Sequence, residues 1–316
     1  MDEQSMIDYN KQAKDKALFY MDSKFWSKPD ITDFEIWMNN FDTLEEKYCA
    51  YKLIDRLVFY SESDIVRLLE FTLYEKIFKR ELLNLEKERQ FSISKEELLE
   101  IKKNFKRGIR IIPLNTGDQS ESSLAMLRYL TNDLGISNSL IINFFDTKSE
   151  DLEDCRNLII VDDFIGSGTQ IKTFWNTQEI NIDGKKIFLN KIKERFPQIE
   201  IDYMCLVTTE EGVDNFLYDD DFPRRDLRIT YGEMLKSKFK VFGDQSIYFE
   251  PDEMDFCKNI LQTLCDNKGI ELLGFQSLDY AIAFHHGPPD CTLPIFYMNN
   301  KQWNYLFKNK KTMLNE

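Results

Sequence analysis

The chain of 316 residues is long enough for one large domain or two, and its 42% hydrophobic and 30% charged residues are typical of a globular protein. It has no run of about 18 apolar residues, so we expect no membrane-spanning helix. Its formal net charge of -14 does not favour nonspecific nucleic-acid binding, so we expect no direct nucleic-acid partner.

Six cysteines are scattered along the chain, and only two histidines, His285 and His286, accompany them. No C-x-x-C pair is present, so we expect buried, reduced thiols and neither a zinc site nor a disulfide framework. The first residues are polar and acidic and lack the apolar segment of a secretory signal peptide. These features predict a cytoplasmic protein.

Residues 1 to 106 have the pattern of a helical cap or docking region. Thr32, Thr43 and Ser94 are each followed three residues later by glutamate, which is the pattern of a helix-starting capping box. Apolar residues recur between them at helical spacing. Four aromatic residues form either part of the core or a face for a partner: Trp26, Phe34, Trp37 and Phe41.

A basic run follows, from Lys95 to Arg110, with the sequence KEELLEIKKNFKRGIR. It has two interpretations. It is either the solvated face of a helix or a local positive patch on an acidic protein.

From Ile109 onward, apolar strand-like runs alternate with helical segments. The strands are expected at Ile109–Leu114, Leu140–Phe145, Leu158–Val161 and Ile199–Thr208. The helices are expected at 124–134, 170–176, 187–196, 211–218 and 245–268. This alternation predicts an α/β fold with a parallel, twisted sheet over residues 107–316, preceded by the helical N-terminal region.

The stretch Asn157 to Thr169, NLIIVDDFIGSGT, carries the clearest chemistry. An unbroken apolar run predicts a strand buried on both faces, and Asp162 and Asp163 follow it. Gly166, Ser167, Gly168 and Thr169 then form a turn before a helix. Such a turn can direct backbone N–H groups at a phosphate, while the carboxylates can bind sugar hydroxyls or Mg²⁺.

Two familiar phosphate motifs do not fit this stretch. A dinucleotide fingerprint needs a third glycine where Ile171 stands, and a P-loop needs a lysine before Thr169. An acidic strand end followed by an ordinary glycine turn remains the structural alternative.

The stretch resembles the 5-phosphoribosyl 1-diphosphate (PRPP) signature of type I phosphoribosyltransferases. The resemblance implies that Asp162 and Asp163 face the ribose hydroxyls and Mg²⁺, and that Gly166 to Thr169 hold the 5-phosphate. It also implies that the Asn115 to Ser123 loop holds pyrophosphate, with donors Thr116, Ser120 and Ser122. A polar loop that only caps the next helix has the same composition.

Both histidines precede a proline-rich turn in AIAFHHGPPDCTLPIFY, residues 281 to 297. Histidine transfers protons near neutral pH, so His286 is a candidate catalytic residue beside Asp162 and Asp163. A turn histidine bonded to the backbone is equally consistent with the pattern.

Three segments together resemble phosphoribosyltransferase-like proteins of bacterial conflict and antiphage systems, including effectors encoded beside retron reverse transcriptases. They are VDDFIGSGT, WMNNF with AYKLIDRLVFYSESDI, and H-x-x-P-x-x-T-L-P at His286, Pro289, Thr292, Leu293 and Pro294. The similarity covers roughly residues 35 to 305. It implies binding of PRPP or a related nucleotide with Mg²⁺, and a partner such as a reverse transcriptase complex or an ATPase.

The chain also departs from common transferases. Gly166 stands where purine phosphoribosyltransferases carry an aspartate, Gln170 replaces the closing threonine, and no flexible-loop lysine can be assigned. Two functions therefore stay open: an enzyme that makes or breaks an anomeric C–N bond, and a nucleotide-sensing or structural subunit that docks a partner.

Overall fold

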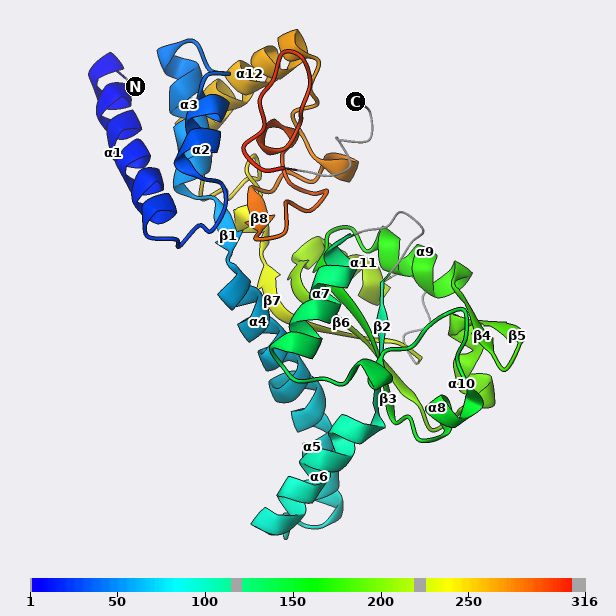
Figure 1. Cartoon of the computed structure of the whole chain (residues 1–316). Helices are drawn as coiled ribbons and strands as arrows, with labels where there is room; N and C mark the ends of the chain where they lie inside the picture. The colour runs from blue at the N-terminus through cyan, green and yellow to red at the C-terminus, as the bar shows by residue number, and fades with distance from the viewer. Residues whose placement is uncertain (1, 115–120, 219–225, 309–316) are drawn as a thin grey trace. The chain divides into compact units, whose positions relative to one another are not determined.

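The computed structural model describes residues 2–114, 121–218 and 226–308 (Figure 1). These residues form two compact units. Unit 1 combines residues 1–65 with 235–316, and unit 2 comprises residues 66–234. The expected division at residues 106 and 107 differs from these junctions, because the C-terminal segment joins the N-terminal helices in one unit.

Unit 2 is built on a four-stranded sheet in the order β2-β3-β6-β7. The strands are β2 (Ile109–Pro113), β3 (Asn157–Ile165), β6 (Glu200–Thr209) and β7 (Arg228–Leu235). β2 pairs in parallel with β3, and β3 pairs in parallel with β6. The apolar runs of β3 and β6 are buried almost throughout, as expected for a parallel sheet covered on both faces. The α/β fold class with a parallel sheet is thus confirmed.

Helices surround this sheet and connect its strands. They are α5 (Lys79–Glu88), α6 (Lys95–Gly108), α7 (Glu121–Asn132), α8 (Ser149–Glu153), α9 (Thr169–Thr177), α10 (Ile192–Arg195) and α11 (Glu210–Tyr218). α4 (Glu62–Phe71) enters the unit and continues into the π-helix η1 (Thr72–Phe78). The helices expected at 124–134, 170–176 and 211–218 are present with small shifts at their ends.

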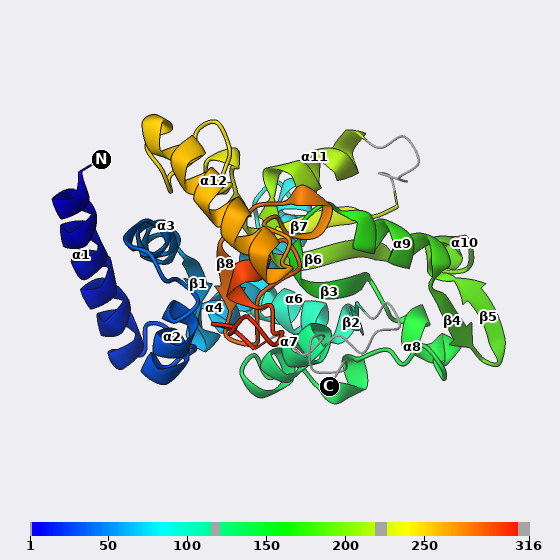
Figure 2. The same ribbon diagram turned by 90° about the horizontal axis from the view of Figure 1, so that it is seen from above.

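Two expectations for unit 2 are wrong. Residues 140–145 make only an isolated parallel bridge, between Ile141 and Ile111, and Phe145 is 84% exposed, so this run lacks the partners of a strand. The expected helix 187–196 is split, because its start belongs to a hairpin. β4 (Glu179–Ile182) and β5 (Lys185–Phe188) form this antiparallel hairpin, which projects at one edge of the unit (Figures 1 and 2).

Unit 1 is mainly helical. Its helices are α1 (Glu3–Asp22), α2 (Ile31–Met38), α3 (Leu44–Asp55) and α12 (Pro251–Lys268). Thr43 caps α3 with a complete capping box, as expected, and Ser94 does the same for α6 of unit 2. Thr32 does not cap α2, because the preceding Asp30 accepts the N–H of Asp33 and starts the helix two residues earlier.

A small parallel sheet joins the two chain segments of unit 1. β1 (Val58–Tyr60) pairs with β8 (Ile282–Phe284), although more than 200 residues separate them in sequence. Short 3-10 turns follow β7, α12 and β8: η4 (Ser237–Phe239), η5 (Phe275–Ser277) and η6 (Pro294–Phe296). In unit 2, two others are η2 (Asn138–Leu140) and η3 (Leu189–Lys191).

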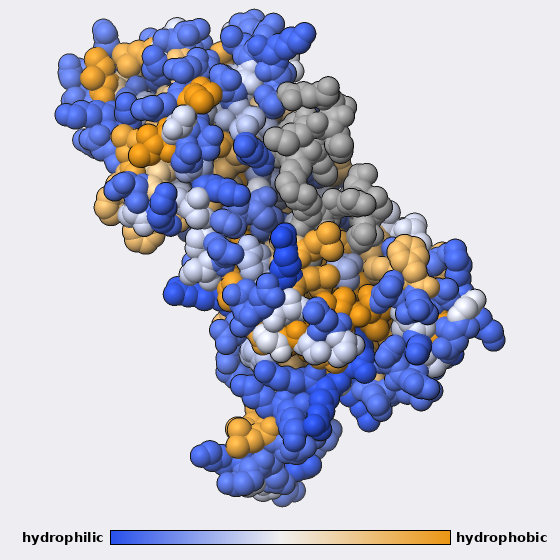
Figure 3. All heavy atoms as spheres, in the orientation of Figure 1, coloured by the Kyte–Doolittle hydropathy of each residue, from blue (hydrophilic) through white to orange (hydrophobic). Residues whose placement is uncertain are grey.

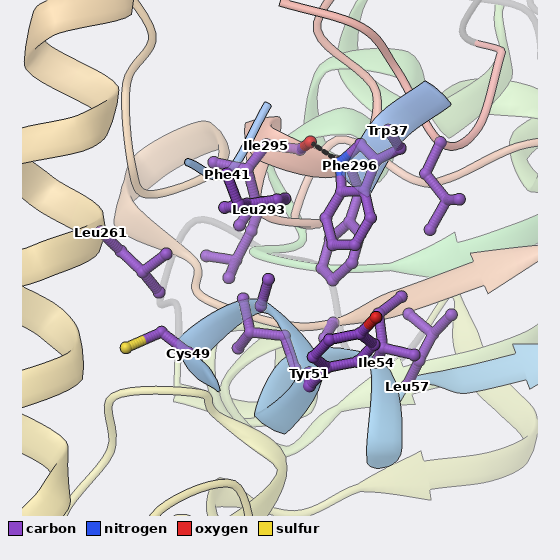
Figure 4. Close-up of a cluster of buried hydrophobic side chains, with 14 of the residues drawn as sticks. Trp37, Phe41, Cys49, Tyr51, Ile54, Leu57, Leu261, Leu293, Ile295 and Phe296 are labelled. Carbon is purple, nitrogen blue, oxygen red and sulfur yellow. Dashed lines mark hydrogen bonds between the residues drawn. The ribbon is translucent and has the colours of Figure 1, made fainter. Parts of the chain in front are cut away.

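The core of unit 1 is rich in aromatic side chains, and Figure 4 shows part of it. Trp37 is fully buried, stacks on Phe296 with ring centroids 5.6 Å apart, and donates its indole N–H to the Ile295 carbonyl at 2.8 Å. Phe41 packs edge-on against Trp37. The aromatic residues predicted at 26, 34, 37 and 41 are all buried, so the core interpretation is confirmed.

No helix in the described ranges is both long and apolar enough to span a bilayer. All six cysteines are buried and free of disulfides.

An ion pair between Arg80 and the buried Asp202 links helix α5 to the sheet of unit 2. Asp202 on β6 has no exposed surface, and Arg80 donates to both of its carboxylate oxygens at 2.9 and 2.7 Å. Thr230 donates to the same carboxylate at 3.0 Å, and Arg228 lies 3.4 Å away. The carboxylate itself is fully buried and has four hydrogen-bond contacts, while the Arg80 and Arg228 side chains remain 29% and 36% exposed.

We expect Arg80→Met to destabilise the protein by about 3 kcal/mol, because it leaves a buried carboxylate without its main partner. The value should lie at the low end of the range for broken buried pairs, since Arg228 remains. Lys79→Met is the matched control: its pair with Glu75 is exposed and should contribute at most about 0.5 kcal/mol. Urea unfolding measures both, and equal midpoints would contradict the assignment.

Candidate functional site

The two adjacent carboxylates lie inside β3, before its carboxyl end. Asp162 pairs with Cys205 of β6, and the ladder continues to Ile165, so the expected end of the strand at Val161 is wrong. Asp163 is the one residue of β3 that is not buried. The two acids therefore differ in their access to solvent.

Asp162 is turned into the protein. It is 3% exposed, and its Oδ2 accepts a 2.5 Å hydrogen bond from the hydroxyl of Tyr203 on β6. Its Oδ1 accepts the backbone N–H of Asp163 at 2.9 Å. Both carboxylate oxygens thus have partners within the sheet, which leaves Asp163 as the acid on the solvent side.

Burial raises the pKa of Asp162 well above its ordinary value of 3.8, and the neighbouring Asp163 charge raises it further. Burial also raises the pKa of Tyr203, with a second contribution from the charge of Asp162. The pair therefore favours its uncharged form, in contrast to an exposed acidic strand end.

The turn Gly166 to Thr169 has its carbonyl groups held on the inside. The Gly166 carbonyl accepts the Thr209 hydroxyl at 2.7 Å, and the Ser167 carbonyl accepts the Asn215 side-chain amide at 3.1 Å. The Gly168 carbonyl accepts the N–H of Lys172 at 3.2 Å, within the first turn of α9.

This arrangement determines where the amides point. In a trans peptide the C=O of one residue and the N–H of the next lie on opposite sides. The N–H groups of Ser167 and Gly168 are therefore directed away from Thr209 and Asn215, whereas the Thr169 N–H donates to the Ser167 hydroxyl at 3.4 Å. Gly168 makes this possible with φ 79° as the N-cap of α9, a backbone angle that L side chains rarely adopt.

Helix α11 packs closely against this turn. Thr209 precedes α11 and accepts the N–H of Gly212 at 2.8 Å while it donates to Gly166. A Cβ atom on Gly212 would lie 2.4 Å from the Gly166 carbonyl oxygen and 2.9 Å from Ile165. Only glycine at position 212 lets the helix approach closely enough to hold the turn.

The outer face of the turn is polar and small. The Ser167 and Thr169 hydroxyls lie 3.0 Å apart, and Thr169 is exposed. Gly168 is the N-cap of the nine-residue helix α9, so the positive end of that helix lies at the turn. Outward amides, two hydroxyls and a helix N-terminus together can bind one phosphate group.

The other predicted site residues lie elsewhere or outside the description. Thr116 and Ser120 are outside the described residues, and Ser122 lies in the first turn of α7. His286 belongs to unit 1, where its ring stacks on Phe284 with centroids 5.3 Å apart. The neighbouring His285 is bonded to Ser27 at 2.7 Å, and burial lowers its pKa.

The sequence analysis did not identify four residues that position the site: Tyr203, Thr209, Gly212 and Asn215. Thr209 with Gly212 had a local signal, because a threonine before Glu-Glu-Gly at the end of a strand is a helix N-cap. Tyr203 had none, since its contact with Asp162 depends on the register of β3 and β6.

The described part of the chain has no group of three or more His, Cys, Asp or Glu side chains arranged to hold a metal ion. A Mg²⁺ site at Asp163 would consequently need oxygen ligands from a substrate, as is usual for Mg²⁺ bound with phosphates.

Comparison with known proteins gives one extensive match. The sequence profile of a family described as PRTase-CE matches residues 34–309. The chain belongs to the PRTase-CE family. The matched interval covers unit 2 and most of unit 1, and it nearly coincides with the predicted resemblance over residues 35 to 305. It supports a phosphoribosyltransferase-like α/β fold.

Solved structures give remote similarities. The AQ2163 protein from Aquifex aeolicus is 11% identical, with a TM-score of 0.26, over 42% of this chain and 56% of its own. Orotate phosphoribosyltransferase from Aeropyrum pernix is 15% identical, with a TM-score of 0.23, over 53% of this chain and 68% of its own. A search of curated proteins gave no match.

We expect Asp162→Asn to flatten the pH dependence of stability. The raised pKa means that the folded chain keeps a proton that the unfolded chain releases, so stability falls as pH rises above about 4 toward the folded pKa. Asparagine keeps the shape and removes this proton. Thermal unfolding between about pH 4 and pH 8 measures the slope. The exposed Asp154→Asn should keep the wild-type slope, and a steeper decline in Asp162→Asn would refute the assignment.

We expect Gly212→Ala to destabilise the protein by about 1–3 kcal/mol, because the new methyl group overlaps the Gly166 carbonyl. Gly108→Ala is the control, since its Cβ would meet nothing closer than 3.4 Å. Denaturant unfolding compares the two variants. Equal losses would show that the close approach of α11 to the turn has no energetic importance.

Proposed function

We propose that this PRTase-CE protein binds the ribose 5-phosphate part of PRPP or of a related nucleotide. The supporting observation is the orientation of the turn: its carbonyls are bonded inward to Thr209 and Asn215, so its amides are directed outward. The phosphate would bind these amides and the Ser167 and Thr169 hydroxyls. No lysine is needed for such a contact.

In this proposal the two acids have separate roles. Asp163 would bind the ribose hydroxyls and Mg²⁺, because it is the acid with access to solvent. Mg²⁺, when bound, would neutralise charge on the phosphate oxygens. Asp162 would position Asp163 by accepting its backbone N–H, while Tyr203 holds Asp162 in place.

The inward orientation of Asp162 favours the nucleotide sensor over the transferase. A transferase of this class would use both acids at the ribose, and Asp162 would have to leave a buried 2.5 Å hydrogen bond to do so. His286 stays a proposed catalytic residue only for the transferase alternative. Under the sensor proposal its contact with Phe284 is structural.

By resemblance, we place the protein in a bacterial antiphage system of the retron kind, acting in the cytoplasm. The helical unit 1 would dock the partner, such as a reverse transcriptase complex or an ATPase. The nucleotide bound in unit 2 would then be the signal that this assembly reads.

We expect PRPP to bind in a manner that requires Mg²⁺, and Asp163→Asn to weaken binding by about 10- to 100-fold, the value of one charge-assisted contact. Isothermal titration calorimetry measures both. Asp154→Asn is the matched control on the surface of unit 2.

A pyrophosphate-release assay on the same samples separates the two functions. Binding without turnover supports the sensor, and turnover that is lost in Asp163→Asn supports the transferase. Wild-type affinity in Asp163→Asn would refute the site itself.

A further inference from the structure

A second concave site lies in unit 2, at the other end of the sheet. A cavity of about 510 Å³ opens between α6 and the segment that follows α7. α6 ends at Gly108, immediately before β2, and the parallel register places that end beside Asn157 at the start of β3. The turn Gly166 to Thr169 follows the carboxyl end of β3, so the cavity and the proposed phosphate site are at opposite ends of the strands.

One wall of the cavity is strongly basic. Lys102, Lys103, Lys106 and Arg107 all line it, at helix positions that share one face. No aspartate or glutamate lines the cavity. This concentration of positive charge occurs in a chain with a net charge of -14.

The helix dipole explains only part of this charge. Cations in the last turn of a helix are stabilised by its negative end, which accounts for Lys106 and Arg107 but not for the two lysines one turn earlier. Like charges at i and i+4, such as Lys102 with Lys106, destabilise a helix. The one ion pair found for these four groups in the described structure is Lys103 with Glu100, at 3.8 Å between exposed side chains.

Two of the lysines contact an aromatic ring. The Lys102 and Lys106 ammonium groups lie 5.1 and 5.6 Å from the ring centroid of Tyr74 on η1. Such cation–π contacts limit the rotamers of long side chains. Binding an anion therefore requires less ordering than it would on a free lysine surface.

The remaining lining is apolar or carries hydroxyls. Leu99, Ile136 and Leu140 supply the apolar surface, and Ser137 and Ser139 supply hydroxyls. Ile136 is 4% exposed, and its backbone N–H donates to the Leu130 carbonyl. These contacts fix the backbone of this wall. The side chains of α5 and α6 form a largely hydrophilic surface with a small hydrophobic patch (Figure 3).

We propose that this cavity binds a nucleoside di- or triphosphate as a second nucleotide site. Its volume suits a ligand of nucleotide size and exceeds what one phosphate needs. The four cations bind the phosphates, and the apolar surface of Leu99 and Leu140 packs against the base. Because the lining has no carboxylate, the nucleotide binds here without Mg²⁺, in contrast to PRPP at Asp163.

The experiment titrates ADP into the full-length protein in EDTA by calorimetry, with pyrophosphate and adenosine as separate probes. We expect saturable ADP binding that weakens with salt, and at least about tenfold weaker binding in Lys103→Glu/Lys106→Glu, since charged hydrogen bonds are lost. Lys11→Glu/Lys14→Glu on α1 is the matched control, with the same charge change and spacing at two exposed lysines. It should bind like wild type.

Two further variants separate the parts of the proposal. Leu99→Ala should weaken ADP but not pyrophosphate, because it removes apolar surface alone. Asp163→Asn should leave ADP binding in EDTA unchanged while it weakens PRPP, so the two sites can fail independently.

Three outcomes would overturn the inference. They are no ADP binding, pyrophosphate binding as tightly as ADP, and an RNA oligonucleotide binding more tightly than ADP through the same lysines. The second would reduce the cavity to a nonspecific anion site, and the third would make it a nucleic-acid surface.

Discussion

The close approach of α11 to the turn after β3 is the constraint on which the candidate site depends. Gly212 has no room for a side chain, and Thr209 and Asn215 hold the turn carbonyls from below. Since each peptide group has two ends, holding the carbonyls inside directs the amides outside. In the proposed site, α11 would thus orient the amides for the phosphate without contributing a group to it.

The two aspartates show how a sheet can make identical neighbours unequal. Successive side chains of a strand point to opposite faces, so Asp162 and Asp163 cannot share one environment. Tyr203 lies on the inner face and donates its hydroxyl to Asp162, while burial and the neighbouring Asp163 charge raise the pKa of Asp162 and favour the protonated acid. One solvent-facing acid is the reason that we propose recognition of a ribose phosphate rather than its chemistry.

The acidic and the basic groups discussed above lie at opposite ends of the strands of unit 2. Asp163 and the outward amides lie toward the carboxyl ends, where a metal-bound phosphate can be held. The basic wall of α6 lies at the amino ends, where no carboxylate lines the cavity. Two sites of different metal requirement on one sheet would let the protein respond to two nucleotide signals.

The sequence by itself determined the α/β class, the buried strands and the glycine turn, because unbroken apolar runs and glycine spacing are local signals. It also predicted the caps at Thr43 and Ser94. The run at 140–145 was misread, because its apolar residues find only a single bridge. Only the tertiary structure decided which aspartate is buried, that α11 holds the turn, and that the basic run faces a cavity. Each of these depends on contacts between segments distant in sequence, and no local pattern encodes them.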